Sequence, residues 1–201
     1  MMRPMRPLLA ILTVALVAAP AYAGPHGKAK PKYHFLLHEV SLGSDVSGDV
    51  AEFAQPRVKA QVEKAFASHP QLVAALDGAP DPATDAKGFR AFLKKQKLTA
   101  AYKVNVEITL AAEETEEVDG KPGTQRLVVR LGIKMFGETM PERVMGFSGE
   151  GSATIKQEIG KKLRTRDREF AWDSAAELAI NDAIATSLAK LALPPAKPSK
   201  K

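Results

Sequence analysis

Two stretches with an apolar residue at every second position constrain the fold of this chain more than any other feature. The first stretch contains Tyr102, Val104, Val106, Ile108 and Leu110, and the second contains Leu127, Val129, Leu131, Ile133 and Met135. Because strand side chains point alternately to opposite faces, each stretch predicts a β-strand with one buried face. The turn residues 119–123 between them predict a long antiparallel hairpin.

Apolar residues at helical spacing predict three helices outside this hairpin. The first is indicated by three apolar residues spaced four apart, Val58, Val62 and Phe66. We expect it to carry Pro56 in its first turn, where proline is tolerated. A second helix is predicted over 85–97. A third is predicted to begin at the capping box 174–177 and to end near Leu191.

Two further strands complete the predicted fold. Residues 33–40 form a short apolar-rich strand, and residues 144–155 form a third antiparallel strand that glycines weaken. The expected order is β-α-α-β-β-β-α. The fold class is therefore α+β, a largely antiparallel sheet of about four strands with two to three helices packed on it. We expect residues 33–193 to form a single domain.

The first 23 residues have the features of a secretion signal. Two arginines precede an apolar run over 8–19, and Ala21 and Ala23 supply the small residues that a signal peptidase reads. Cleavage is predicted after Ala23, so the exported chain would begin at Gly24. The apolar run is shorter than the about 20 residues that span a bilayer, so a membrane anchor is not expected.

The exported chain is expected to be soluble and to work in the periplasm or outside the cell. It has no cysteine, so we expect neither a disulfide nor a lipoprotein anchor. Residues 24–32 are interpreted as a flexible basic tether and residues 194–201 as a disordered basic tail. No transmembrane segment is expected after cleavage.

Several sequence patterns that resemble catalytic or metal-binding motifs are incomplete. Residues 146–150 read GFSGE, whereas a nucleophile elbow needs glycine at the last position and a turn into a helix. His34 and His38 are about 13 Å apart on a regular strand, too far to share a metal. Asp45 and Asp49 do not follow the calcium-loop spacing. We therefore expect no catalytic residue, no metal, no cofactor and no enzymatic activity.

Charged segments offer the remaining candidate contacts. The basic connector, Lys161, Lys162, Arg164, Arg166 and Arg168, is either an anion-binding or partner-binding surface or a solvated loop. The acidic run 113–117 is either a solvated hairpin end, an acidic contact surface or a weak cation site. Nucleic acid is not an expected partner, because the chain is exported and only 6% of its residues are aromatic.

The small-residue patterns carry a resemblance to a known group. Residues 100–104 read AAYKV before the predicted strand, and residues 175–183 read AAELAINDA in the last helix. In this order of elements the chain resembles bacterial envelope domains of the curli secretion component and the penicillin-binding protein activator. It is also similar to the amino-terminal domain of the translocation protein beside the outer membrane. The resemblance implies a non-enzymatic scaffold or regulator, although the anchoring cysteine of many such proteins is missing here.

These observations favour a soluble, exported accessory module of the bacterial cell envelope that contacts another envelope protein. An anionic surface is a second, weaker expected contact. The alternative is a carrier of a small ligand or lipid, with a pocket between the sheet and the helices. An enzyme with an unrecognised polar site is the remaining hypothesis.

Overall fold

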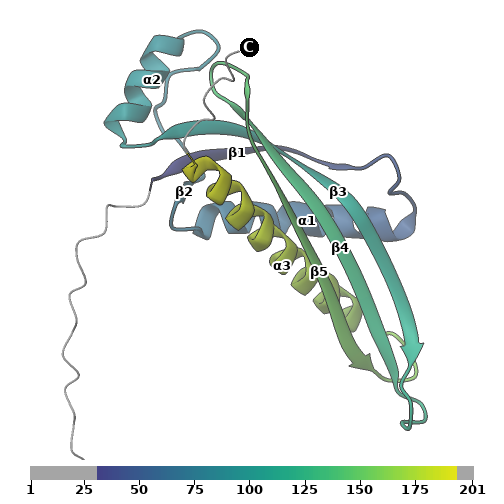
Figure 1. Ribbon diagram of the computed structural model, residues 1–201. Helices are drawn as coiled ribbons and strands as arrows, with labels where there is room; N and C mark the ends of the chain where they lie inside the picture. Colours follow the sequence, from purple (N-terminus) through teal and green to yellow (C-terminus); the bar gives the residue numbers. More distant parts are fainter. Residues whose placement is uncertain (1–30, 194–201) are drawn as a thin grey trace, which may run out of the picture.

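A computed structural model describes residues 31–193. The predicted signal peptide with Ala21, Ala23 and Gly24, most of the tether and the tail 194–201 lie outside the described residues. The elements in chain order are β1 Tyr33–Leu42, α1 Asp49–Ser68, β2 Leu72–Val73, α2 Ala86–Lys95, β3 Ala100–Glu117, β4 Gln125–Thr139, β5 Met145–Ile159 and α3 Thr165–Ala192 (Figure 1). The general α+β class is confirmed.

The sheet is mixed and has five strands in the order β2-β1-β3-β4-β5. β1 pairs in parallel with both β2 and β3, whereas β3–β4 and β4–β5 are antiparallel. The prediction of a largely antiparallel sheet of about four strands was therefore wrong. β2 is only two residues long, too short to show an alternating pattern, and the path through α1 and α2 returns the chain to β3 in the direction of β1.

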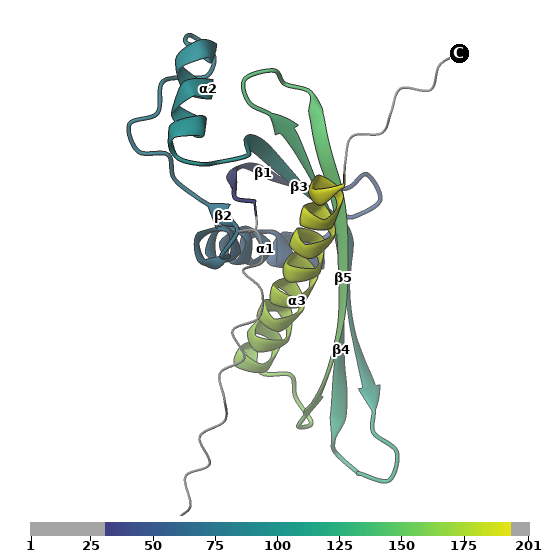
Figure 2. The same cartoon turned by 60° about the vertical axis from the view of Figure 1, so that its left-hand side comes forward.

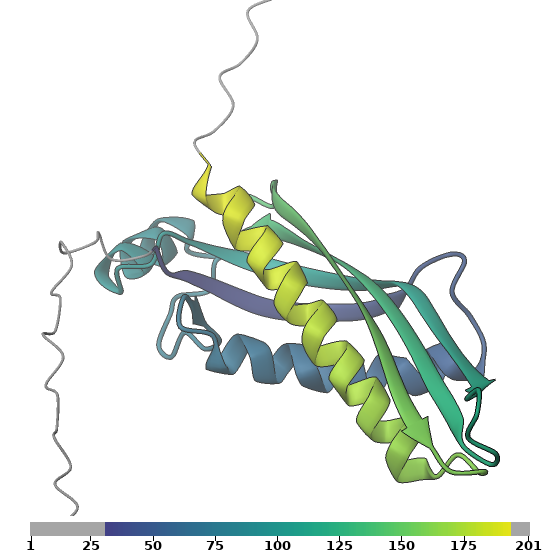
Figure 3. The ribbon, with the colours of Figure 1, turned by 60° about the horizontal axis from the view of Figure 1, so that its bottom comes forward.

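Helices α1 and α3 pack against one face of this sheet (Figures 1 and 3). Their buried residues include Val58 and Val62 from α1 and Ile180 and Ala183 from α3, all 0% exposed. They meet the inward-facing side chains of β3 and β4 in one hydrophobic core. No helix in residues 31–193 combines the length and the apolar character that crossing a membrane requires.

The glycines of β5 allow α3 to approach the sheet closely. A Cβ at Gly151 would collide with the carbonyl oxygen of Ala179 in α3, and one at Gly149 would collide with the Ser187 hydroxyl. Glycine in a strand often marks such a close approach of another backbone. Ser148 lies within β5 and pairs with Phe136, so residues 146–150 form no strand-to-helix turn.

Two predicted helix starts were wrong. Helix α3 begins at Thr165, so Ser174 lies inside it and the connector's Arg166 and Arg168 are helical. Helix α1 begins at Asp49, which places Pro56 within the helix, where it cannot donate a backbone hydrogen bond to Glu52. In both helices the buried face extends towards the amino terminus, through Ala171 in α3 and through Ala51 and Ala54 in α1.

Helix α2 stands apart from the main core (Figure 2). Asp85 caps it by accepting a hydrogen bond from the backbone N–H of Gly88 at 2.7 Å. Phe89 and Leu93 bury its inner face in a small second cluster together with Leu98 and Ala101. The helix is therefore held by a core of its own next to the first residues of β3.

Candidate functional site: a groove along the open edge of β1

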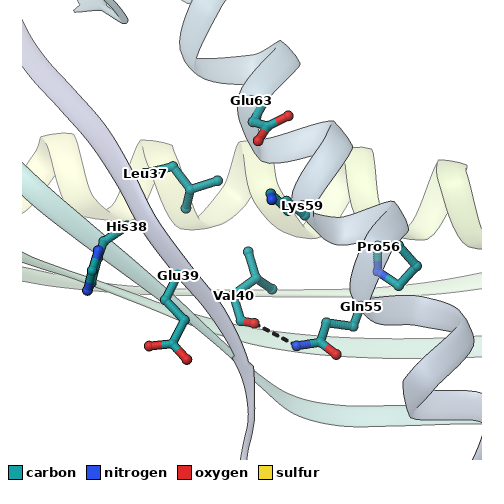
Figure 4. A pocket seen from close by; sticks show the side chains of 8 residues that line it. All are labelled: Leu37, His38, Glu39, Val40, Gln55, Pro56, Lys59 and Glu63. Atoms are coloured by element: carbon teal, nitrogen blue, oxygen red, sulfur yellow. Dashed lines mark hydrogen bonds between the residues drawn. The ribbon is translucent and has the colours of Figure 1, made fainter.

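Strand β1 changes its pairing at His38. Leu37 pairs with Val104 and Glu39 pairs with Asn105, so His38 has no partner in β3 and forms a bulge. Leu37 and Val40 point towards α1, whereas His38 and Glu39 point away from it (Figure 4). The bulge therefore presents two polar side chains in succession on the side away from α1.

Most of the outer edge of β1 has no strand beside it. Among the described residues, β2 covers this edge only at Tyr33 and His34. Further along, the carbonyl oxygen of Val40 accepts a hydrogen bond from the side-chain amide of Gln55 in α1 at 2.7 Å (Figure 4). A helix side chain thus supplies the donor that a neighbouring strand's N–H would supply in a wider sheet.

A groove of about 510 Å³ lies between this edge and α1. We call it the β1–α1 groove, and it is lined by Leu37, His38, Glu39, Val40, Gln55, Pro56, Lys59 and Glu63 (Figure 4). Its volume is within the range typical of ligand sites. Apolar side chains and charges of both signs line it, which suits a polypeptide better than a purely apolar ligand.

The β1–α1 groove has the features of a strand-addition site. An extended peptide that pairs with a sheet edge gains affinity from main-chain hydrogen bonds, and adjacent pockets select its side chains. Here the free edge provides the backbone groups, and the apolar side chains of Leu37 and Pro56 provide a contact surface. A bound peptide N–H would replace the Gln55 amide on the Val40 carbonyl.

His34 is the buried histidine of β1. Its side chain is 4% exposed, and Nδ1 donates to the carbonyl oxygen of Val73 in β2 at 2.7 Å. His38, by contrast, is exposed at the bulge. Within residues 31–193, no group of three or more His, Cys, Asp or Glu side chains is arranged to hold a metal ion.

The burial of His34 predicts a pH-dependent stability. Desolvation lowers the pKa of His34 below its ordinary value of 6.5, although its hydrogen bond to Val73 opposes the shift. The unfolded chain therefore binds a proton that the folded protein resists, and stability is lost as the pH falls below 6.5. We expect the urea midpoint of the His34→Gln variant to change less between pH 7 and pH 5 than that of the wild type. An equal pH dependence in both proteins would contradict this role.

The basic connector is divided between a loop and the first turn of α3. Lys161 and Lys162 are exposed in the loop, and Arg164 and Arg166 are exposed at the helix start. Arg168 instead donates from Nε to Glu113 Oε2 at 2.7 Å and is only 27% exposed. The first four cations are therefore exposed at the surface, whereas Arg168 forms an ion pair within the domain. An anion-binding role for the basic connector stays a prediction.

Glu113 is part of the fold and not of a solvated hairpin end. The acidic run 113–117 lies within β3, with Glu113 on the inner face. The carboxylate oxygen that accepts from Arg168 also accepts from Trp172 Nε1, at 2.7 Å. Glu114, on the outer face, pairs with Arg130 at 2.7 Å. The alternation of the strand thus gives two adjacent carboxylates different roles.

The aromatic ring of Phe53 in α1 links the Glu113–Arg168 pair to the first helix. The guanidinium carbons of Arg57 and Arg168 each lie 3.9 Å from the centroid of the Phe53 ring. Arg57 also pairs with Glu169 at 2.9 Å and with Asp173 at 3.6 Å. These contacts join the first halves of α1 and α3 through cation–π and ionic interactions.

The space between the sheet and the helices is filled by side chains. Val104, Val106, Ile180 and Ala183, which face one another across this layer, are all 0% exposed. The carrier alternative, with a pocket between the sheet and the helices, stays a prediction. The loop with Asp45 and Asp49 lies between β1 and α1, and Asp49 begins the helix.

Comparison with known proteins finds similarity in fold and none in sequence. No family model and no curated protein matches this chain. Several solved structures of bacterial proteins are similar to this chain, all with TM-scores below 0.5. One, provisionally described as a lipoprotein from Caulobacter crescentus, is 10% identical with a TM-score of 0.44, and the alignment covers 77% of this chain and 92% of that one.

Two further structures are similar to a comparable degree. A protein from Xanthomonas campestris assigned to the DUF330 family model is 9% identical, with a TM-score of 0.43 and coverage of 82% of this chain and 90% of the other. A Helicobacter pylori protein, provisionally described as a neuraminyllactose-binding hemagglutinin homolog, is 10% identical, with a TM-score of 0.41 and coverage of 84% and 91%. The likeness is confined to fold, and the finer resemblance to the curli and activator group stays a prediction.

The α1 residues of the β1–α1 groove were not predicted as site residues from the sequence. Gln55, Lys59 and Glu63 have no distinctive pattern in the sequence, because their common feature is proximity to a strand edge. The available signal was local: a continuous strand 33–42 broken by two polar residues, His38 and Glu39, indicates a bulge. Bulges are frequent at sheet edges and beside functional sites.

Proposed function

We propose that this chain is an exported, non-enzymatic accessory module of the bacterial cell envelope that binds an extended segment of another envelope protein. The segment adds to the free edge of β1 in the β1–α1 groove. The single observation that supports the proposal most is the Val40 carbonyl, which is capped by the Gln55 side chain at 2.7 Å and has no strand beside it within residues 31–193. The predicted secretion signal supports the location.

Site-specific crosslinking tests the proposal. A photoreactive phenylalanine analogue at Lys59 would lie in the groove, whereas the same analogue at Lys64 lies on α1 away from it. Both lysines are exposed, so the two positions form a matched pair. With intact envelope extracts, we expect a discrete crosslinked partner from position 59 and a much weaker product from position 64.

Hydrogen exchange supplies the second measurement. Binding of the recovered partner should slow amide exchange in residues 35–42, because strand addition protects edge N–H groups. Equal crosslinking from both positions, or no change in β1 exchange on binding, would contradict the proposal. Either result would leave the fold intact and move the contact to another surface.

A further inference from the structure

The described domain carries almost no net charge, unlike the chain as a whole. Residues 31–193 contain all 23 acidic residues and 22 of the 29 Lys and Arg residues, a net charge of −1. After the predicted signal, the remaining cations are Lys28, Lys30, Lys197, Lys200 and Lys201. The net positive charge of the exported chain therefore comes from its two terminal segments. Within the domain, positive charge can only be a local excess on part of the surface.

Helix α2 is the most strongly basic element of the domain. It carries four exposed cations, Lys87, Arg90, Lys94 and Lys95, and a fifth exposed cation, Lys97, follows two residues after its end. No acidic residue lies between the first and the last of the five. Lys87, Arg90 and Lys94 follow one another at spacings of three and four residues, which places them on one helical face. Phe89 and Leu93 on the opposite face are buried, so the helix is held with its cations towards solvent.

The β4–β5 turn adds exposed apolar side chains beside this face. Arg90 pairs with Glu142 at 2.8 Å, and Met140 packs against the buried cluster of α2, so the turn lies next to this helix. After Glu142 come Arg143, which is exposed, and then Val144 and Met145, which are 59% and 60% exposed. Figure 2 shows α2 and this turn at the same end of the molecule, opposite the β3–β4 turn.

Both basic terminal segments join the domain near this end. The backbone N–H of Thr99, just after α2, donates to the carbonyl oxygen of Lys32 at 2.8 Å. Tyr33 donates from its hydroxyl to the carbonyl oxygen of Leu191, near the end of α3, at 3.5 Å. Lys32 and Leu191, close to the two ends of the described chain, therefore lie near the part of the domain from which α2 extends.

The carboxylates around the α2 face do not cancel its charge. They are Asp77, Asp81, Asp85, Glu138 and Glu142, against the four cations of α2 together with Lys97 and Arg143. Asp85 is used as the helix cap and Glu142 is paired with Arg90. Lys87, Lys94, Lys95, Lys97 and Arg143 have no ion pair shorter than 4.0 Å among the described residues.

We propose that this surface, the α2 face (Lys87, Arg90, Lys94, Lys95, Lys97, Arg143, Val144 and Met145), docks on an anionic phospholipid bilayer. The cations are attracted to the negative surface potential of such a membrane. Val144 and Met145 insert their side chains between the headgroups, as apolar residues do at a membrane interface. Cations and exposed apolar side chains together distinguish this surface from one suited only to a soluble polyanion.

Vesicle co-sedimentation tests the proposal with the chain that begins at Gly24. The probes are vesicles of phosphatidylglycerol with phosphatidylethanolamine, and neutral phosphatidylcholine vesicles as the reference. We expect binding to the anionic vesicles at low salt, progressive loss as salt screens the charges, and no binding to the neutral vesicles. Absence of binding to anionic vesicles would overturn the proposal, as would equal binding to both kinds.

Two double variants that each remove two positive charges locate the surface. Lys94→Gln/Lys95→Gln should weaken binding by more than about tenfold, because each basic residue near the membrane contributes to the attraction. Lys161→Gln/Lys162→Gln, on the connector at the far end, should change it by less than about twofold. A larger loss of vesicle binding from the Lys161/Lys162 variant than from the Lys94/Lys95 variant would overturn the assignment to α2 and support the connector instead.

A third variant separates lipid from other anions. Val144→Ser/Met145→Ser keeps every charge, so it should weaken vesicle binding without changing its salt dependence. Circular dichroism and the urea midpoint would confirm that each variant is folded. If the chain bound soluble polyglutamate as tightly as the anionic vesicles, and this variant had no effect, the partner would be an acidic polymer or protein and the membrane proposal would be wrong.

Discussion

Replacing Gly151 with valine is expected to lower the free energy of unfolding by about 3 kcal/mol or more. A Cβ at this position would collide with the carbonyl oxygen of Ala179 and would lie 2.7 Å from the backbone nitrogen of Ala183. Both obstacles are backbone atoms of α3, so no side chain can rotate out of the way. The helix itself would have to move, which would open its contact with β4 and β5.

Urea unfolding followed by fluorescence measures this effect. Trp172 is the only tryptophan of the chain and is 0% exposed, so its emission reports loss of the core. Gly160→Val is the matched control, because a Cβ at Gly160 meets no atom within 4 Å. We expect the control to unfold close to the wild-type midpoint. Equal midpoints for the two valine variants would contradict the close helix–strand contact.

Glu113→Ala is expected to lower the free energy of unfolding by about 2–3 kcal/mol, because hydrogen bonds to a charged acceptor are among the stronger ones in proteins. One oxygen of Glu113 accepts from both Arg168 and Trp172, each at 2.7 Å. The carboxylate is only 14% exposed, so water cannot readily replace it. Alanine would leave the buried indole N–H of Trp172 without an acceptor.

Glu114→Ala is the control for this substitution. Glu114 is the next residue on the same strand, but its side chain is 53% exposed and its pair with Arg130 lies on the surface. Such pairs contribute little, so Glu114→Ala should unfold near the wild-type midpoint. The unfolding midpoint of Glu113→Gln should lie between those of the two alanine variants, because the glutamine amide oxygen accepts a hydrogen bond but carries no charge. Equal stability of the two alanine variants would show that Glu113 does not join α3 to the sheet.

The strands and helices that were predicted well are those whose signal is local. The two alternating stretches lie in β3 and β4, and Val106 pairs with Met135 across the hairpin. Helix α2, predicted over 85–97, spans 86–95 with Asp85 as its cap. In each case the period of the apolar residues reflects a single buried face, which short-range sequence is sufficient to encode.

The errors arose where distant contacts outweighed local preference. Ser174 and Glu177 have the spacing of a capping box, but Trp172 and Ala171 before them are buried against the sheet and extend the helix. Glu113 appeared to belong to a solvated acidic run because its partners, Arg168 and Trp172, lie more than 50 residues away. Neither contact leaves a periodic pattern in the sequence.

The two candidate binding surfaces also combine features visible in the local sequence with features that depend on distant contacts. The cations of α2 are visible in the sequence, and their position on one face follows from helical spacing. Their relation to Val144 and Met145 does not, because it depends on the Arg90–Glu142 pair across 52 residues. Beyond the bulge at His38 and Glu39, no local pattern indicates the β1–α1 groove, since it exists only because β2 stops after two residues and α1 lies beside the exposed edge.

The sequence by itself determined the α+β class, the β3–β4 hairpin and the glycine-rich strand that allows close packing. These depend on interactions among neighbouring residues or on the lack of a side chain. Only the tertiary structure decided the parallel pairing of β1, the open edge beside α1 and the burial of Glu113. Those features depend on where segments distant in the chain meet, which the fold as a whole sets through packing of its single main core.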